Sequence, residues 1–497
     1  MQLWLDGFAI ALQPHNLLYL LVGTAVGLFV GVLPALGAMF GIVIMLPFTF
    51  KMPAVTSIIM LVAIHASAIY GDSITSILIN TPGGVGSVAS CWDGYPMAKQ
   101  GKSATALGIS TMGSLLGGII GWITLAAIAP LLTVFAIKIG AAEYCVLGIM
   151  ALSLLSIAAK GETIKGVILA GFGLMLSFVG QDPVEGLNYR FTFGSTYLED
   201  GLPLVSVTVG LFALSQAMLL VEEGGTIAEV FELSGSLWEG IKETWRRPLT
   251  ILRGGLIGIW IGILPALGVS AANIIAYFTE KKASKEPETF GQGNPAGLLA
   301  PEVSKNACGV GDMIPTFTLG IPGSASTAIL LVALTIHGLE PGPRFFLSGT
   351  DPYAVFAGIL LAQFAFFISG LLLARYFSKV VFIPNALIGP IVILLSFIGA
   401  YAMRNRLLDV LVTILFGLIG YFLYKLRWPS PCLVLGIVLG DLIESNFHRA
   451  LQVGDDTYRV FFTRPISLVL VIITAIFMLW PYLADLIKLL VERRRAQ

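Results

Sequence analysis

The chain has few charged side chains for its length. Of its 497 residues only 12% are Asp, Glu, Lys or Arg, whereas 56% are hydrophobic. A soluble protein usually has about a quarter charged residues, so a chain of this composition cannot cover its surface in water. Its 29 basic and 29 acidic residues cancel, so nothing indicates a nucleic-acid partner. The composition predicts an all-α polytopic membrane protein.

Cysteine, histidine and catalytic motifs are also scarce. The four cysteines, Cys91, Cys145, Cys308 and Cys432, are far apart and have no metal-ligand spacing, which argues against a metal cluster or disulfide framework. The four histidines are too scattered for a membrane-embedded enzyme. Gly101-Lys102-Ser103 lacks the glycine that a phosphate-binding loop needs at position 96, where Pro96 stands. We therefore expect no enzyme activity and no cofactor.

Long apolar runs are abundant instead, and each spanning helix needs roughly 20 apolar residues. We expect about 12–15 transmembrane helices on that basis, with two polar-rich, broken stretches at 71–90 and 296–337. The candidate spans are 17–33, 36–50, 54–70, 103–136, 141–158, 163–180, 203–221, 250–264, 266–280, 353–374, 383–401, 406–424, 432–446 and 465–486.

Basic residues indicate the orientation. The hydrophilic stretch Glu222–Pro248 ends in Arg246 and Arg247, and the C-terminus ends in three arginines. Cytoplasmic loops are enriched in Lys and Arg, so both segments are predicted to be cytoplasmic. The acidic loop 181–201 and the N-terminus are then periplasmic.

Two motifs occur twice in the same order. GVLPALG at Gly31–Gly37 recurs as GILPALG at Gly262–Gly268, an offset of 262 − 31 = 231. The Pro-Gly segment that follows Asp72 recurs after Asp312, an offset of 312 − 72 = 240. We predict a first transmembrane repeat at 1–221, a cytoplasmic amphipathic linker at 222–249, a second repeat at 250–462, and a last helix with a basic tail at 463–497.

The predicted orientation makes these repeats inverted, and broken helices at matching places of inverted repeats indicate a transporter site at mid-membrane. The alternative is that Gly and Pro are merely packing residues and tolerated kinks. A half-helix that begins after each Pro-Gly would point backbone N–H groups at a small anion with more than one carboxylate. The candidate substrate-binding residues are Ser73, Thr75, Asn80, Thr81, Pro82, Gly83, Gly84, Ser87, Thr318, Gly320, Pro322, Gly323, Ser324, Ser326 and Thr327.

Asp72 and Asp312 occupy matching positions and are candidates for carrying the coupling ion, because a carboxylate inside a membrane is costly. Each could instead lie at a helix end in water or cap a half-helix. Asn273 could offer a carbonyl to the cation or form an interhelical hydrogen bond. We expect His65 to be a packed histidine rather than a proton relay. The residues from Glu444 to Arg449 are expected to form a structural ion pair.

With these motifs assembled, the sequence resembles the large membrane subunit of the tripartite tricarboxylate transporters, the TctA family. The resemblance covers almost the whole chain and includes Tyr70–Gly84, Asp93–Gly108, Gly180–Gly194 and the highly specific stretch Pro287–Pro343. The signature segments of the family correspond here to Asn80–Gly84 and Gly320–Ser324. The sequence departs from the usual family pattern at both aspartates.

The resemblance implies a bacterial inner-membrane permease that imports di- or tricarboxylates by Na+ or proton symport, with an elevator motion. It also implies two partners, a small TctB-like membrane subunit and a periplasmic TctC-like solute-binding protein. A self-sufficient organic-anion carrier or exchanger with the same architecture is the alternative. Nothing in the resemblance identifies the carboxylate.

Overall fold

The computed structural model describes residues 2–33, 36–136, 139–158, 163–182, 189–223, 234–264, 268–380, 385–476 and 478. Within this part of the chain nearly all regular structure is helical, and a single two-stranded antiparallel sheet pairs Gly180 with Arg190. Among the described residues, eight helices are long and apolar enough to cross a membrane, and six more are apolar but shorter. The predicted all-α polytopic fold is confirmed.

The chain divides into two compact units. The larger comprises residues 1–134 and 208–421. Its elements are α1 (Gln2–Ala11), α2 (Pro14–Val32), α3 (Gly37–Thr49), α4 (Ala54–Ile79), η1 (Val85–Ser87), α5 (Val88–Lys99), α6 (Ser103–Ala136), the π-helix η2 (Val209–Leu214), α10 (Ser215–Glu223), α11 (Leu237–Trp245), α12 (Pro248–Ile263), α13 (Gly268–Ala283), η3 (Pro287–Thr289), α14 (Pro295–Gly311), α15 (Met313–Leu319), α16 (Ala325–Ile336), η4 (Pro343–Leu347), α17 (Asp351–Val380), α18 (Asn385–Arg404) and α19 (Leu407–Lys425), whose last turn crosses the boundary.

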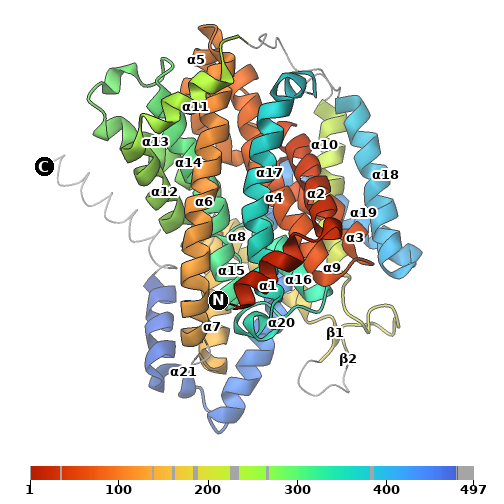
Figure 1. Ribbon diagram of the computed structural model, residues 1–497. Helices are drawn as coiled ribbons and strands as arrows, with labels where there is room; N and C mark the ends of the chain where they lie inside the picture. Colours follow the sequence, from red (N-terminus) through yellow and green to blue (C-terminus); the bar gives the residue numbers. More distant parts are fainter. Residues whose placement is uncertain are drawn as a thin grey trace, which may run out of the picture. The chain divides into compact units, whose positions relative to one another are not determined.

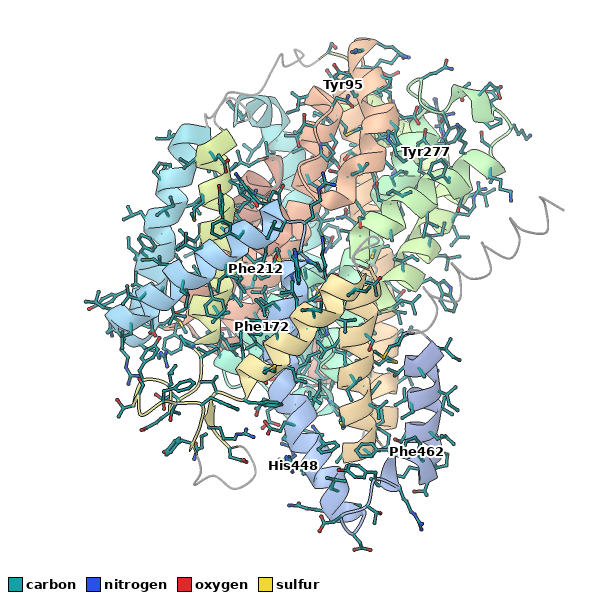
Figure 2. All side chains as sticks on the ribbon, turned by 180° about the vertical axis from the view of Figure 1, so that it is seen from behind. Tyr95, Phe172, Phe212, Tyr277, His448 and Phe462 are labelled. Carbon is teal, nitrogen blue, oxygen red and sulfur yellow. The ribbon has the colours of Figure 1, made fainter. Side chains whose placement is uncertain are left out.

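The smaller unit comprises residues 135–207 and 422–497. Its elements are α7 (Ala141–Ala158), α8 (Thr163–Ser177), β1 (Gly180–Gln181), β2 (Tyr189–Arg190), α9 (Leu204–Thr208), α20 (Ser430–Val453) and α21 (Val460–Thr463). Gly173 of α8 lies against the backbone of α20, and Gly436 of α20 lies against that of α8, so these two helices pack closely. His448 on α20 and Phe462 on α21 lie toward one end of this unit (Figure 2).

In the larger unit α6 and α17 are the long helices drawn in orange and teal in Figure 1. The indole N–H of Trp122 on α6 donates to the carbonyl of Phe356 on α17 at 2.8 Å. Helix α4 packs against α2, α3, α5, α14 and α17. Of the residues in its apolar 18-residue stretch, 89% are buried. A helix that is buried on all sides can carry polar residues that a lipid-facing helix cannot.

The two LPALG copies lie at equivalent places in the fold. Each follows a helix, α2 or α12, and each ends at a glycine of positive φ, Gly37 at 66° and Gly268 at 64°, which opens the next helix. Pro34, Ala35 and residues 265–267 lie outside the described residues. Because glycine adopts this backbone conformation with the least strain, the repeated glycine has a structural reason.

Glycine stripes show the duplication in the packing. On α2 and on α12, three glycines spaced four residues apart let the helix approach a neighbouring backbone closely. Gly23, Gly27 and Gly31 face Met60, Ile64 and Ala68 of α4, whereas Gly254, Gly258 and Gly262 face Ala300, Ser304 and Cys308 of α14. The contacted positions again differ by 240 residues and the glycines by 231. Helices α4 and α14 are therefore equivalent elements.

Equivalent helices run in opposite directions where they meet. His65 of α4 contacts Gly309 of α14, whereas Ser73, further along α4, contacts Glu302, which lies earlier on α14. This antiparallel crossing is what an inverted duplication requires. The broken character predicted for 71–90 is corrected in one respect: the first nine of those residues continue α4, because nothing before Asn80 interrupts the helix, and the break falls at 80–84.

Candidate functional site

The two Pro-Gly segments end their helices with the same backbone geometry. Asn80, at φ 56°, ends α4, and Gly320, at φ 70°, ends α15. The N–H of Thr81 donates to the carbonyl of Thr75 at 3.5 Å, and that of Ile321 to the carbonyl of Pro315 at 3.3 Å. All three pairs of positions differ by 240 residues. A left-handed residue and this backward bond are the usual end of a helix, here repeated in both copies.

After each proline the chain folds back onto the helix it has just left. A Cβ atom at Gly83 would lie 2.6 Å from the Cα of Asp72, and one at Gly323 would lie 2.7 Å from the Cα of Asp312. The N–H of Gly83 donates to the carbonyl of Asp72 at 3.2 Å. Neither position has room for a side chain, so close packing within the protein already explains both glycines.

A new helix begins just after each Pro-Gly, as predicted, at η1 and α5 in the first copy and at α16 in the second. The two starts are capped differently. In α5 the N–H of Ala89 donates to the Asn273 side-chain oxygen of α13 at 2.8 Å. In α16 the Ser324 hydroxyl accepts from the N–H of Thr327, whose hydroxyl accepts from the N–H of Ser324. The Asn273 oxygen therefore forms the interhelical bond that the sequence left open.

Several predicted hydroxyls bond to their own backbone. Thr75 donates to the carbonyl of Asp72, Ser87 to that of Gly84 and Thr318 to that of Ile314. The more accessible predicted residues lie at the two tips: Asn80 and Thr81 are exposed, and Pro82, Gly84, Ser324 and Ser326 are partly exposed. At the start of α16 the N–H groups of Ala325 and Ser326 have no acceptor within the helix. The two tips are therefore the accessible part of the predicted anion site.

A buried charge cluster, which the sequence analysis missed, joins α4 to α14. The ammonium group of Lys305 is 0% exposed, lies 2.7 Å from Asp72 Oδ1, donates to the Ser73 hydroxyl and lies 3.4 Å from Glu302 Oε2. The available signal was the Glu-Lys pair three residues apart in an apolar stretch. Its partner on α4 could not be seen.

Glu302, at the centre of this cluster, accepts four hydroxyl hydrogen bonds. Serines of α4, α5 and α6 supply them: Ser73 at 2.6 Å, Ser90 at 2.5 Å, Ser110 at 2.8 Å and Ser114 at 3.1 Å. Hydrogen bonds to the ionised form stabilise a buried carboxylate. Glu302 thus holds α4, α5, α6 and α14 together, and Ser73 serves this cluster.

Asp312 lies at the junction of α14 and α15 and has no comparable partner. Its side chain is 0% exposed, and among the described residues neither carboxylate oxygen has a hydrogen-bond partner. The Ser324 hydroxyl approaches it but bonds to Ser326 and Thr327. His65 Nε2 lies 3.8 Å from Asp312 Oδ1. The two predicted aspartates are both buried, and only one faces a permanent cation.

Two other side chains singled out in the sequence, His65 and Glu444, form structural hydrogen bonds. His65 is packed and hydrogen-bonded to the Gly309 carbonyl at 3.0 Å. In the smaller unit Glu444 pairs with Arg190 through two hydrogen bonds of 2.5 and 3.0 Å, so its ion pair reaches β2 rather than Arg449. Within the described residues no group of three or more His, Cys, Asp or Glu could hold a metal ion.

These features define a class of protein. Two equivalent, oppositely directed helices, each leading into a Pro-Gly break and a new helix start, are the architecture of secondary transporters built from inverted repeats. The comparisons agree: residues 17–435 match the family model of the tripartite tricarboxylate transporter TctA family. The chain belongs to this family and is a multi-pass membrane protein.

Two proteins of Agrobacterium vitis are similar to the chain. One, described as an uncharacterized 52.8 kDa protein in the TAR-I ttuC' 3' region, is 35% identical over 463 residues, covering 93% of this chain and 92% of that protein. The other, an uncharacterized protein in the TAR-II ttuC' 3' region, is 33% identical over 214 residues, covering 42% of this chain and 87% of that protein. No solved structure matches the chain.

Proposed function

We propose that the chain is the large permease subunit of a binding-protein-dependent secondary transporter, which imports di- or tricarboxylates across the bacterial inner membrane by cation symport. The matched breaks at Asn80 and Gly320 carry this proposal, because they give two helix starts that only a protein-lined site can accommodate at membrane depth. Membership of the TctA family supports it. The proposed partners are a TctB-like membrane subunit and a TctC-like periplasmic binding protein.

The two tips, residues 80–84 and 324–326, are the proposed binding surface for the carboxylates. A helix N-terminus attracts anions through its free N–H groups and its partial positive charge. Hydroxyls of Thr81 and Ser326 lie at these tips and are at least partly exposed. With Lys305 fully buried against Asp72, N–H groups and hydroxyls, rather than a lysine, hold the substrate in this proposal.

An elevator motion is part of the proposal. Such a motion needs one body that moves and one that stays, and the chain divides into two separately compact units. The alternative function is a self-sufficient organic-anion exchanger. A single comparison separates the two: uptake of radiolabelled citrate and succinate into proteoliposomes that hold the chain and its small subunit, with and without the periplasmic protein. Uptake that needs no periplasmic protein would favour the exchanger.

The orientation is proposed from the basic loops and can be tested by labelling. The native cysteines are all buried, so background labelling should be low. Thr196 and Ser236 are exposed. An impermeant thiol reagent applied to whole cells with a permeable outer membrane should label Thr196→Cys, and should label Ser236→Cys only after the inner membrane is opened. The reverse pattern would overturn the orientation.

A further inference from the structure

The buried charges of the two repeats are paired crosswise. Asp72 corresponds to Asp312, and His65 corresponds to Lys305, each at a distance of 240 residues along the chain. Lys305 of the second repeat faces Asp72 of the first at 2.7 Å, and His65 of the first faces Asp312 of the second at 3.8 Å. Each aspartate therefore meets the residue that lies seven positions before the other aspartate. The antiparallel crossing of α4 and α14 creates both pairs.

The first pair is complete as it stands. The Lys305 ammonium contacts Asp72 and Ser73, and the nearby Glu302 is satisfied by four serine hydroxyls. Asp72 thus has a basic side chain of the protein itself beside it.

The second pair lacks a positive charge. A carbonyl oxygen can only accept, so the 3.0 Å bond to Gly309 places a hydrogen on His65 Nε2, whereas Nδ1 has no partner among the described residues. With that imidazole neutral, an ionised Asp312 would be a buried charge with no counter-ion, approached only by the Ser324 hydroxyl. Such a charge is very costly. One proton, on the Asp312 carboxylate or on His65 Nδ1, removes the imbalance.

We propose that His65 and Asp312 together form the binding site for one coupling proton. In the equivalent pair, Lys305 supplies beside Asp72 the positive charge that the proton supplies here. The inference rests on the proposed cation symport and assigns that cation and its site. A proton from water binds to the pair and makes it neutral overall, and its release leaves one negative charge. Moving a charge through the membrane is costly, so the loaded form of the carrier moves more easily than the empty form.

Among the described residues no other charged side chain pairs with His65 or Asp312. Asp312 interacts electrostatically with Cys308, which lies one turn earlier on α14. Helices α3, α15 and α16 carry no ionisable side chain. Arg253 of α12 pairs with Glu280, and on α4 the Tyr70 hydroxyl bonds to Thr111. Within the part of the chain that the structure describes, no further ionisable side chain forms a hydrogen bond or an ion pair with His65 or Asp312. The helices that pack against α4 and α14 carry these other ionisable groups: His15 and Tyr19 of α2, Cys91, Asp93, Tyr95 and Lys99 of α5, Glu239, Lys242 and Glu243 of α11, Tyr277, Lys281 and Lys282 of α13, and Asp351, Tyr353, Arg375, Tyr376 and Lys379 of α17.

The test uses the full chain with its small membrane subunit and periplasmic protein in proteoliposomes. Two rates are measured with radiolabelled citrate and succinate in Na+-free buffer: exchange without a gradient, and accumulation driven by an imposed pH gradient. Asp312→Asn should keep exchange and lose pH-driven accumulation by at least tenfold. His65→Lys, which makes the second pair permanent like the first, should do the same.

Two controls frame this result. Asp351→Asn, at the start of α17, should keep both rates. Asp72→Asn should lower the yield of folded protein, but accumulation by the folded protein should still depend on the pH gradient. Accumulation by Asp312→Asn that follows the pH gradient as in the wild type would overturn the inference. The inference would also be overturned if a Na+ gradient at constant pH drove accumulation by the wild type and Asp312→Asn abolished this Na+ dependence.

A second measurement needs no substrate. The melting temperature of the purified wild-type chain should fall as pH rises from 5 to 9, because loss of the proton leaves a buried negative charge, whereas that of Asp312→Asn should fall less. Equal pH profiles would overturn the inference even if transport could not be assayed. If the wild type neither exchanges nor accumulates citrate or succinate but shows the pH difference, the proposed function fails for these substrates while the proton site stands.

Discussion

At the first Pro-Gly segment Asp72 faces Lys305, whereas at the second Asp312 faces His65. The backbones around the two aspartates are alike, since both glycines press against the aspartate Cα and both helices end at a left-handed residue. The repeats have therefore kept their geometry and diverged in charge. One aspartate has a fixed partner, and the other can change its charge as a proton binds.

The comparison separates structural from functional carboxylates. A buried carboxylate that is fully hydrogen-bonded and paired stabilises the arrangement of helices, as Glu302 and Asp72 do. A buried carboxylate without a partner is costly and persists where it has a use. Their matching positions in the repeats would predict the same role for both aspartates. Only the residues that they face, Lys305 and His65, distinguish them.

The largest effect is expected from removing the fixed cation. Lys305→Met would leave Asp72 and Glu302 buried together without a positive charge, which should cost about 3–5 kcal/mol of stability. Unfolding in mixed detergent micelles measures this loss. Adding Asp72→Asn should recover part of it, because one unpaired charge is then gone. Wild-type stability of Lys305→Met would show that the first pair is no more fixed than the second.

A smaller and symmetric effect is expected from filling the two close contacts. Gly83→Ala and Gly323→Ala each place a Cβ against aspartate backbone, and forced overpacking costs about 1–3 kcal/mol. Gly171→Ala, in a helix with open space at the new Cβ, is the matched control and should be neutral or slightly stabilising. A loss at only one of the two glycines would contradict the equivalence of the breaks.

The smallest effects should come from the two caps. Asn273→Ala removes the cap that α13 gives to α5, and Ser324→Ala removes the cap that α16 gives itself. Each should lower stability by about 0.5–2 kcal/mol. Hydrogen exchange of the first turn of α5 should rise only in Asn273→Ala, and that of α16 only in Ser324→Ala. Exchange that rises at both helix starts in either variant would mean that the caps are not independent.

Local residue types predicted much of this architecture correctly. The fold class follows from the apolar runs, and the breaks follow from Pro82 and Pro322 with their neighbouring glycines, because these residues act on the backbone within a few positions. The start of the first break was placed nine residues too early. The helix continues through polar residues such as Asp72 and Ser73, because they are buried against α14.

The partners of the predicted residues were not predictable in the same way. Asn273 reaches Ala89 across 184 residues and Lys305 reaches Asp72 across 233. Ser110 and Ser114 lie in the apolar candidate span 103–136, and only the position of Glu302 gives them a role. The C-terminal helix predicted beyond residue 478 lies outside the described residues.

The sequence by itself determined that this chain lies in a membrane, is duplicated, and breaks two helices at matching places, because each of these depends on composition or on residues close together in the chain. The tertiary structure decided which of the two aspartates has a counter-charge. That depends on the antiparallel crossing of α4 and α14, which brings Lys305 to one aspartate and His65 to the other, and a crossing between distant helices leaves no local pattern in the sequence.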